Sequence, residues 1–227
     1  MGIENHVRLF RNANHILKSE LDSSWRKMEY CAIDLETTGL ELTTDEIISI
    51  GAVQIKDARV NSAGNYYQKV RPAQMPSPSS ILIHGIRAVD LESAPPVGQV
   101  FPEFAERLRG RVVIAHAAWV ESAFLEDHLE TVDLNMAKRL IDTASLARVS
   151  GAVEVNLEHE PSLEHLARSL KLPAYSPHHA LGDALTTAVV FLALATELER
   201  RKLETGKSLL TLRELLKLSR RSARTQW

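Results

Sequence analysis

Residues 30–40 read YCAIDLETTGL, and this stretch carries the strongest structural signal in the chain. Its first residues are apolar and partly β-branched, which predicts a buried strand over Tyr30–Leu35. Side chains alternate along a strand, so Asp34 and Glu36 point to the same face at its carboxyl end. The segment that follows, Thr37–Leu40, supplies backbone donors and a glycine turn beside both acids. The stretch therefore predicts a strand that ends in an acidic, sharply turning loop.

Two carboxylates on one face repel each other unless a proton or a cation lies between them. Hard divalent ions such as Mg²⁺ or Mn²⁺ prefer oxygen ligands, which makes Asp34 and Glu36 a candidate metal site. The D-x-E pattern alone is weak, because many edge strands carry alternating acids on a solvated face. Other residues of the chain are needed to distinguish a metal site from a solvated strand face.

A second polar group stands at the start of a long apolar segment, where residues 178–184 read HHALGDA. Asp183 falls in the first turns of the helix expected there, and a carboxylate on an apolar helix face is costly to bury without a partner. A cation shared with Asp34 would supply that partner. His178 precedes Asp183 by five residues. An imidazole that titrates near neutrality is suited to deprotonating a water molecule.

The rest of the chain predicts an α/β fold with a mixed five-stranded sheet flanked by helices. Apolar and β-branched runs predict further strands over Ile47–Ile55, Tyr66–Val70, Val112–Ala115 and Leu140–Ile141. Helical spacing is present over Val100–Leu108, Trp119–Leu129, Thr143–Val149, Ser162–Leu170 and Ala180–Leu198. Three strands in succession, followed by alternating helices and strands, indicate that the first three strands form a meander.

Two segments flank the expected core domain of residues 30–198. Residues 1–29 have a helical pattern, which most often means a helix packed on its own domain. Residues 199–227 are expected to form a basic amphipathic C-terminal helix, and residues 200–227 hold nine Lys or Arg and two Glu around a series of leucines. This end is either a solvated amphipathic helix or a contact for nucleic acid or for a protein partner such as a polymerase.

Composition describes an ordinary globular chain and excludes several classes of protein. The single cysteine, Cys31, excludes an internal disulfide and a cysteine-rich zinc site, which suits the cytoplasm. We find no stretch close to the ~20 apolar residues of a membrane span and no signal peptide, so we expect no membrane association. The formal net charge of −2 gives no global attraction to nucleic acid. Any such binding needs local patches or bound cations.

Three segments taken together resemble the motifs of the DEDDh family of 3′→5′ exonucleases. They are D-x-E-T-T-G at 34–39, I-A-H at 114–116 and H-x-A-L-x-D-A at 178–184, and they occur in the family's order and at its distances. Members of the family include the epsilon subunit of bacterial DNA polymerase III, ribonuclease T and oligoribonuclease. The similarity covers about residues 30–198. It implies a ribonuclease H-like fold, two divalent ions, Mg²⁺ or Mn²⁺, and removal of nucleotides from the 3′ ends of single-stranded DNA or RNA.

The same resemblance implies a role for each polar residue. Asp34 would bridge both metal ions, and Glu36 and Asp183 would complete one of them. His178 would be the general base rather than His179, because its distance from Asp183 matches the family. The residues expected to contact the substrate are Thr37, Thr38, Gly39, Leu40, which could wedge against the terminal base, and His84, which is either a substrate contact or a structural residue.

The middle motif departs from the family pattern. The family has roughly H-N-A-x-F-D, whereas residues 116–121 read HAAWVE, so the fourth carboxylate is Glu121. Its longer side chain could still reach the second metal directly or through water. The alternative is a solvated helix acid beside an impaired site. We expect Trp119 to lie in the core and both His116 and Asp142 to be structural.

Two other functions stay open on sequence grounds. A non-catalytic scaffold could dock on a polymerase through its basic end, and a phosphodiesterase of short oligonucleotides could use the same metal site in a groove with a closed end. DNA and RNA are not distinguished, since that choice depends on contacts to the 2′-OH.

Overall fold

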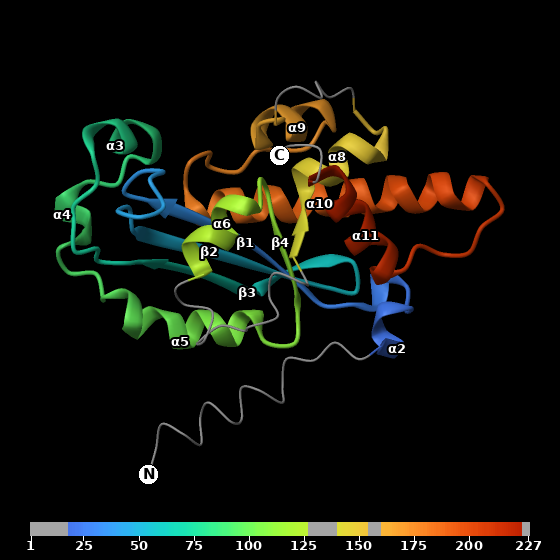
Figure 1. Cartoon of the computed structure of the whole chain (residues 1–227), viewed down its shortest axis with the longest axis horizontal. Helices are drawn as coiled ribbons and strands as arrows, with labels where there is room; N and C mark the ends of the chain where they lie inside the picture. Colours follow the sequence, from blue (N-terminus) through green and yellow to red (C-terminus); the bar gives the residue numbers. More distant parts are fainter. Residues whose placement is uncertain (1–17, 127–139, 154–159, 224–227) are drawn as a thin grey trace, which may run out of the picture.

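The computed structural model of the chain describes residues 18–126, 140–153 and 160–223, and Figure 1 gives its arrangement. The helical pattern of residues 1–17, including Leu9, Phe10 and Ile16, lies outside these ranges. The described part forms one sheet with helices on both faces, as the sequence predicts.

The sheet has five strands in the order β3-β2-β1-β4-β5. Their bounds are β1 Tyr30–Thr37, β2 Ile47–Lys56, β3 Arg59–Lys69, β4 Val112–Ala115 and β5 Leu140–Asp142. The first three strands pair antiparallel as a meander, and β4 and β5 add in parallel on the other side of β1. This confirms the mixed sheet. Strand β3 begins seven residues before the predicted Tyr66, because pairing with β2 holds polar residues that have no strand pattern of their own.

Helices occupy the predicted stretches of residues 30–198 within the described ranges. The single helix expected over residues 199–227 is wrong, because residues 205–211 are not helical and Gly206, with a φ of 75°, turns the chain between two separate helices. The longer ones are α5 Val97–Leu108, α6 Trp119–Glu126, α8 Thr143–Ser150, α9 Leu163–Ser169, α10 Ala180–Glu204 and α11 Leu212–Ala223. The shorter ones are α2 Lys18–Leu21, the 3-10 helix η1 Trp25–Lys27, α3 Pro78–His84 and α4 Ala88–Leu91. Helix α10 continues to Glu204, past the expected end at Leu198.

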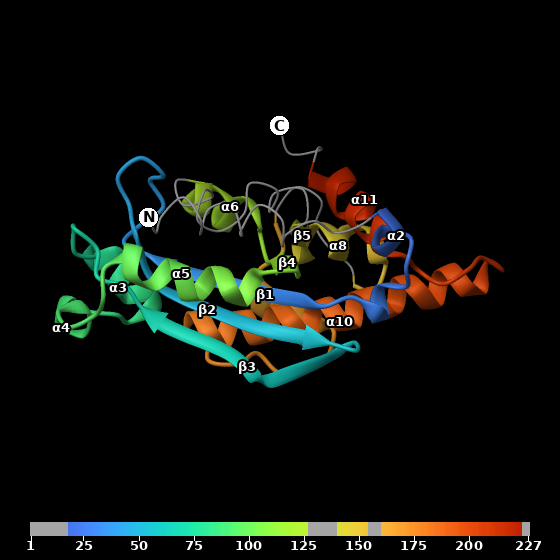
Figure 2. The same cartoon turned by 90° about the horizontal axis from the view of Figure 1, so that it is seen from below.

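The sheet is covered on both faces, by α5 and α6 on one and by α10 with α8 on the other (Figure 2). Alternate residues of β1 enter the two cores: Tyr30 and Ala32 face α10, and Cys31 and Ile33 face α5. Cys31 is fully buried, as its apolar surroundings predict. Burial on both faces explains why β1 and β4 read as continuous apolar runs.

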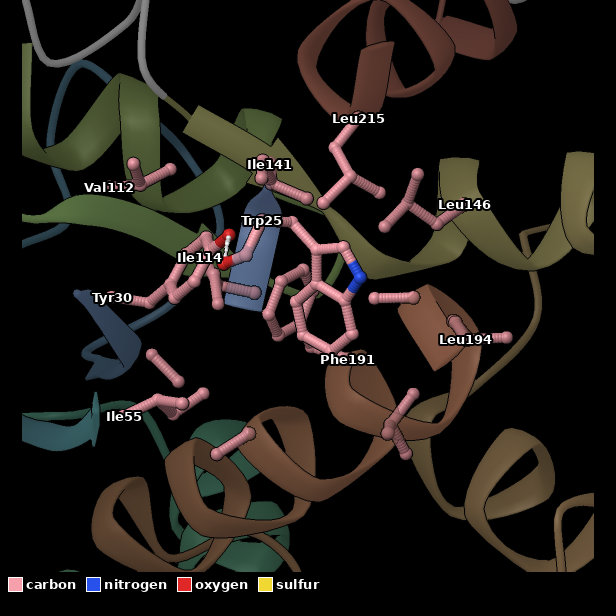
Figure 3. Close-up of a cluster of buried hydrophobic side chains, with 14 of the residues drawn as sticks. Trp25, Tyr30, Ile55, Val112, Ile114, Ile141, Leu146, Phe191, Leu194 and Leu215 are labelled. Atoms are coloured by element: carbon pink, nitrogen blue, oxygen red, sulfur yellow. Dashed lines mark hydrogen bonds between the residues drawn. The ribbon is translucent and has the colours of Figure 1, made fainter. Parts of the chain in front are cut away.

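The two flanking segments contribute to the same core as α10. Figure 3 centres on Trp25, whose ring meets Phe191 of α10 edge to face with 5.9 Å between the ring centroids. The Tyr30 hydroxyl donates to the Trp25 carbonyl at 2.7 Å. Leu212 and Leu215 of α11 are fully buried in this cluster. The limits at residues 30 and 198 therefore mark the motif-bearing region, while the hydrophobic core extends beyond both.

Helix α10 satisfies the length and composition of a membrane span, with a mean hydropathy of 1.5 over an 18-residue window. From the sequence we found no segment close to a membrane span, and we therefore underestimated the apolar character of α10. Half of that window is buried inside the fold, where α10 packs on β1 and β2. A core helix passes the same test, so the helix gives little support to membrane insertion.

Candidate active site

The carboxyl end of β1 and the first turn of α10 bring the three acids of the sequence motifs together. Asp34 and Glu36 alternate with the buried Leu35 and so share one face of β1. Asp183 lies in the first turn of α10. One carboxylate oxygen from each of the three acids lies within 4.8 Å of the other two, and all three are partly buried.

A glycine on β2 allows this approach. Gly51 is paired with Asp34 across the antiparallel ladder. A Cβ at Gly51 would collide with the Ala180 carbonyl and the Leu181 nitrogen, so the start of α10 rests directly on the sheet backbone. The site geometry thus depends on a residue without a side chain in the neighbouring strand.

The electrostatics of the acids reflect their crowding. Burial and the charges of Glu121, Glu36 and Asp183 raise the pKa of Asp34 well above its usual range. Burial, followed by the charge of Asp183, raises the pKa of Glu36 to about 7. The pKa of Asp183 is also raised by burial, although a hydrogen bond from the His178 backbone opposes the effect. Without a counter-charge, at least one of the acids must hold a proton.

This donor set fits a divalent metal ion. The three acids offer only oxygen, which suits hard cations such as Mg²⁺ and Mn²⁺ rather than soft ones. A cation between them would relieve the repulsion that raises their pKa values. The described residues contain one group of three or more potential metal-ligating side chains at this spacing, and it is Asp34, Glu36 and Asp183.

His178 lies at the edge of the acidic group, in the loop before α10. Its backbone N–H donates to Asp183 Oδ2 at 2.8 Å, and its side chain is exposed. Its φ of 59° is in the left-handed region. The charge of His178 acts on both Asp183 and His84: it lowers the pKa of each. The His179 ring stacks on Tyr67, with 4.4 Å between ring centroids.

The turn after β1 is held by its own threonines. The Thr37 hydroxyl donates to the Gly39 carbonyl, and the Thr38 hydroxyl donates to Asp45 at 2.7 Å. The Thr38 backbone N–H donates to the Glu46 carbonyl at 2.9 Å. Both threonines are buried and shape the turn, so the sequence overstated how many donors face a ligand. Leu40 is 73% exposed beside them, as a wedge residue would be.

His84 lines a cavity of about 480 Å³ next to the acids, together with Tyr67, Lys69, Gly85, Ile86, Arg87, Asp90 and His179. The Ile86 N–H donates to His84 Nδ1 at 3.0 Å, so the neutral ring carries its proton on Nε2. Burial and the nearby His178 lower the pKa of His84. The Nε2 atom of His84 is buried, so a substrate contact would involve the face or edge of the ring that lines the cavity.

Glu121 lies outside the group of three acids but is coupled to it. It is 5% exposed on the first turn of α6, and its Oε2 has no hydrogen-bond partner in the part of the chain that the structure describes. Burial above all, with the charges of Asp142 and Glu160, raises its pKa to about 8. The interpretation as a solvated helix acid is therefore wrong, because Glu121 is buried and its charge acts on Asp34.

Other residues of the middle motif are structural. His116 bonds to the Thr143 hydroxyl at 2.9 Å and to the Pro161 carbonyl at 2.7 Å, and Asp142 caps α8 by accepting from the Ala144 N–H. Both roles were expected. Trp119 is half exposed, so its predicted core position is wrong: it lies at the open start of α6, where its indole N–H donates to Glu160.

Comparison with known proteins identifies the chain. The sequence model of the RNase T exonuclease family matches residues 31–191, well over half of the chain. The chain belongs to this exonuclease family. The matched region begins at β1 and ends in α10, and so contains all of the acids described above.

Two curated relatives of this exonuclease are much longer proteins. The PolC-type DNA polymerase III of Thermotoga petrophila is 34% identical over 172 residues, which make up 75% of this chain and 12% of the polymerase. The 3′-5′ exonuclease DinG of Staphylococcus haemolyticus is 28% identical over 189 residues, 83% of this chain and 20% of that protein. The chain thus spans one fifth or less of the length of either relative.

Among solved structures, Exonuclease X in complex with 5′-overhanging duplex DNA matches with a TM-score of 0.57 at 22% identity, covering 82% of this chain and 99% of that one. The likeness concerns the fold, which is the ribonuclease H-like fold of exonucleases. It confirms the fold class that the motifs implied.

Sequence reasoning missed the cavity beside the exonuclease site. Tyr67 and Lys69 come from the edge strand β3, and Arg87 and Asp90 from α4, far from any motif. Strand alternation over the predicted Tyr66–Val70 already places Tyr67 and Lys69 on one face. The sequence held no signal that this face adjoins His84 and His179.

Proposed function

We propose that this chain is a metal-dependent 3′→5′ exonuclease that releases nucleotides one at a time from the 3′ ends of single-stranded DNA or RNA. The observation that carries the proposal is the convergence of Asp34, Glu36 and Asp183 within 4.8 Å on a family scaffold whose other members include named exonucleases. Three partly buried acids that lie this close together repel each other and serve no packing purpose. They are explained if they hold cations at which a phosphodiester is cleaved.

In this proposal Asp34, Glu36 and Asp183 hold two divalent ions, Mg²⁺ or Mn²⁺, and Glu121 contributes from the α6 side. When bound, such ions polarise the phosphate and neutralise the charge that develops during hydrolysis. The charges of Glu121, Glu36 and Asp183 all act on Asp34, which suits a ligand common to both ions.

His178 is proposed to accept the proton of the attacking water on an imidazole nitrogen. Its backbone bond to Asp183 ties the loop to a metal ligand, and its exposed side chain stays free to reach the water and then to release the proton to solvent. Attack at phosphorus expels the 3′ oxygen of the next nucleotide. The products are a nucleoside 5′-monophosphate and a chain shortened by one nucleotide.

The terminal nucleotide is proposed to lie against the turn after β1 and His84. Leu40 projects from this turn and presents an apolar surface to a base. Gly39 lets the substrate backbone approach closely, while Thr37 and Thr38 hold the turn in shape. Lys69 and Arg87 line the cavity together with His84 and offer positive charge to an anionic ligand.

The relatives suggest which substrate and which kind of protein partner this chain has. One is part of a replicative polymerase, and the fold neighbour holds DNA, which supports a DNA substrate and a polymerase or other protein partner contacted through residues 200–227. The free buried thiol of Cys31 suits a reducing compartment, so we place the enzyme in the cytoplasm.

The test is cleavage of 3′- and 5′-labelled single-stranded DNA and RNA oligonucleotides with Mg²⁺ or Mn²⁺. Asp34→Asn should abolish cleavage, because it removes a ligand charge without changing size. The matched control is Asp57→Asn, the same change in an exposed turn at the far end of β2, which should cleave normally. Stepwise shortening from the 3′ end that depends on Asp34 supports the proposal. No metal-dependent cleavage of any substrate would overturn it and favour a scaffold function.

A further inference from the structure

The loop that carries His178 adopts a backbone that most residues avoid. It joins α9 to α10, and three of its residues have positive φ: Lys171 at 57°, Ser176 at 39° and His178 at 59°. A left-handed conformation costs free energy for a residue with a Cβ, and it persists only where the surroundings hold it. The contacts that hold this loop therefore decide where the His178 side chain stands.

Those contacts come mainly from the first two turns of α10. Gly182 brings the loop close, because a Cβ there would collide with the carbonyls of Tyr175 and Ser176. The His178 N–H donates to Asp183 Oδ2 at 2.8 Å. The Tyr175 N–H donates to the Thr186 hydroxyl at 2.9 Å. The bond between Tyr175 and Thr186 fixes the loop just before Ser176 and His178, the two residues with positive φ nearest to α10.

The Thr186 hydroxyl is oriented for this task. It donates to the Gly182 carbonyl at 2.9 Å, so its lone pairs face the Tyr175 N–H. Thr186 is 1% exposed, so its hydroxyl is held inside the fold and its position is fixed by the packing of α10. Loss of the hydroxyl would leave the Tyr175 N–H without its acceptor, next to the glycine on which the loop rests.

We propose that Thr186 is a positioning residue for the exonuclease reaction: its hydroxyl, by holding Tyr175, fixes the strained loop that presents His178 to the metal site. The inference rests on the proposed role of His178 as proton acceptor. Thr186 itself is buried inside α10, and its hydroxyl bonds to Tyr175 and Gly182.

The chain contains a matched control in the next residue. Thr187 is also fully buried on α10, yet its hydroxyl has no hydrogen-bond partner among the residues described. Thr186→Val and Thr187→Val therefore make the same isosteric change, and only the first removes an acceptor from the loop. Thr186→Ser keeps the hydroxyl and serves as the conservative variant.

The experiment measures kcat and KM on a labelled oligonucleotide with Mg²⁺ for all three variants. Thr186→Val should lower kcat by on the order of ten- to a hundredfold with little change in KM, as a misplaced catalytic group does. Thr186→Ser should keep most of the activity, and Thr187→Val should match the wild type. Equal losses in Thr186→Val and Thr187→Val, or no rescue by Thr186→Ser, would overturn the proposal.

A double-variant comparison separates positioning from general damage. In a His178→Ala background, Thr186→Val should cost less than about twofold, because the group it positions is already gone. A full additional loss would show that Thr186 acts through the acids or the fold instead. If His178→Ala itself leaves kcat unchanged, the proposed general base is wrong, which is a different failure from that of Thr186.

Amide hydrogen exchange gives a readout that does not need activity. The Tyr175 N–H should exchange faster in Thr186→Val than in the wild type, while amides in the middle of α10 keep their protection. Unchanged exchange at Tyr175 would contradict the proposal even if activity fell. Should Thr186→Val fold poorly, Thr186→Ala replaces it in the same measurements, with the same expected direction.

Discussion

Glu121 is the residue at which the site differs most from the family pattern. It is buried, its Oε2 lacks a partner in the described structure, and its pKa is raised to about 8 by burial and by the neighbouring Asp142 and Glu160. An apolar residue at this position would cost less free energy to bury. The presence of a carboxyl group therefore indicates that Glu121 has a function. We therefore regard Glu121 as a functional replacement for the family's aspartate.

Two substitutions at Glu121 test this view. We expect Glu121→Asp to change kcat by less than about tenfold, and Glu121→Gln, which removes the charge, to lower it by on the order of a hundredfold. Glu126→Gln, at the exposed end of α6, is the matched control and should have no effect. A large gain in Glu121→Asp would mean that the native site is impaired.

At the scale of elements, the position of α10 on the sheet decides the site. Gly51→Ala adds a methyl group that must displace the Ala180 backbone, and with it Asp183 and the His178 loop. We expect a loss of stability of about 1–3 kcal/mol and a fall in kcat. The control is Gly98→Ala, at the start of α5, where a new Cβ has no atom within 4 Å. Thermal unfolding and the oligonucleotide assay measure both effects, and an active, stable Gly51→Ala would refute this account.

Helix α11 is integrated into the fold through its apolar face. Leu212, Leu215 and Leu216 are buried against α8 and β5, and several basic residues of this end already have acidic partners, such as Lys202 with Glu214 at 2.6 Å and Arg213 with Asp22 at 2.6 Å. A partner or nucleic acid would thus meet its exposed charged face, not its leucines.

Variants of α11 separate these roles. Leu215→Ala should destabilise the protein by about 2–5 kcal/mol in urea unfolding, because it empties a fully buried position. Lys217→Ala, on the exposed face, should leave stability unchanged. If residues 200–227 bind nucleic acid, Lys217→Ala should also flatten the salt dependence of oligonucleotide binding. An unchanged slope would leave this face to a protein partner.

For the whole molecule, the raised pKa values predict an unusual dependence of stability on pH. Between its ordinary pKa of 4.5 and its folded value of about 7, Glu36 holds more protons in the folded protein than in the unfolded chain. Its contribution is therefore complete below pH 4.5 and is lost as the pH rises through 7. For this residue the loss is up to about 3 kcal/mol. Asp34 and Asp183 act in the same direction.

Urea unfolding from pH 5 to 8, with a chelator and with excess Mg²⁺, measures this effect. We expect the metal-free protein to lose stability as the pH rises and Mg²⁺ to restore it, because the cation binds the deprotonated acids of the folded state. Asp34→Asn should weaken both the pH dependence and the Mg²⁺ effect. Rising stability with pH in the chelator would contradict the crowding of these acids.

The sequence alone predicted those elements whose residues carry their own pattern. Strands β1, β2 and β4 and helix α8 begin within a residue of their predicted positions, and the order of strands gave the meander. The grouping of Asp34, Glu36 and Asp183 was predicted because alternation along a strand and helical phase are local properties. The start of β3, the end of α10 and the exposure of Trp119 were not found, because they depend on neighbours distant in the chain.

Only the tertiary structure decided how the acids meet. Gly51 on β2 sets the distance between α10 and β1, Thr186 holds the loop that carries His178, and Tyr67 stacks on His179 from the sheet edge. It also placed Trp25 and the α11 leucines in the core, where sequence suggested appended segments. Patterns of two to four residues record which face a side chain takes. Contacts between elements far apart in sequence depend on shape and close packing, which no local pattern records.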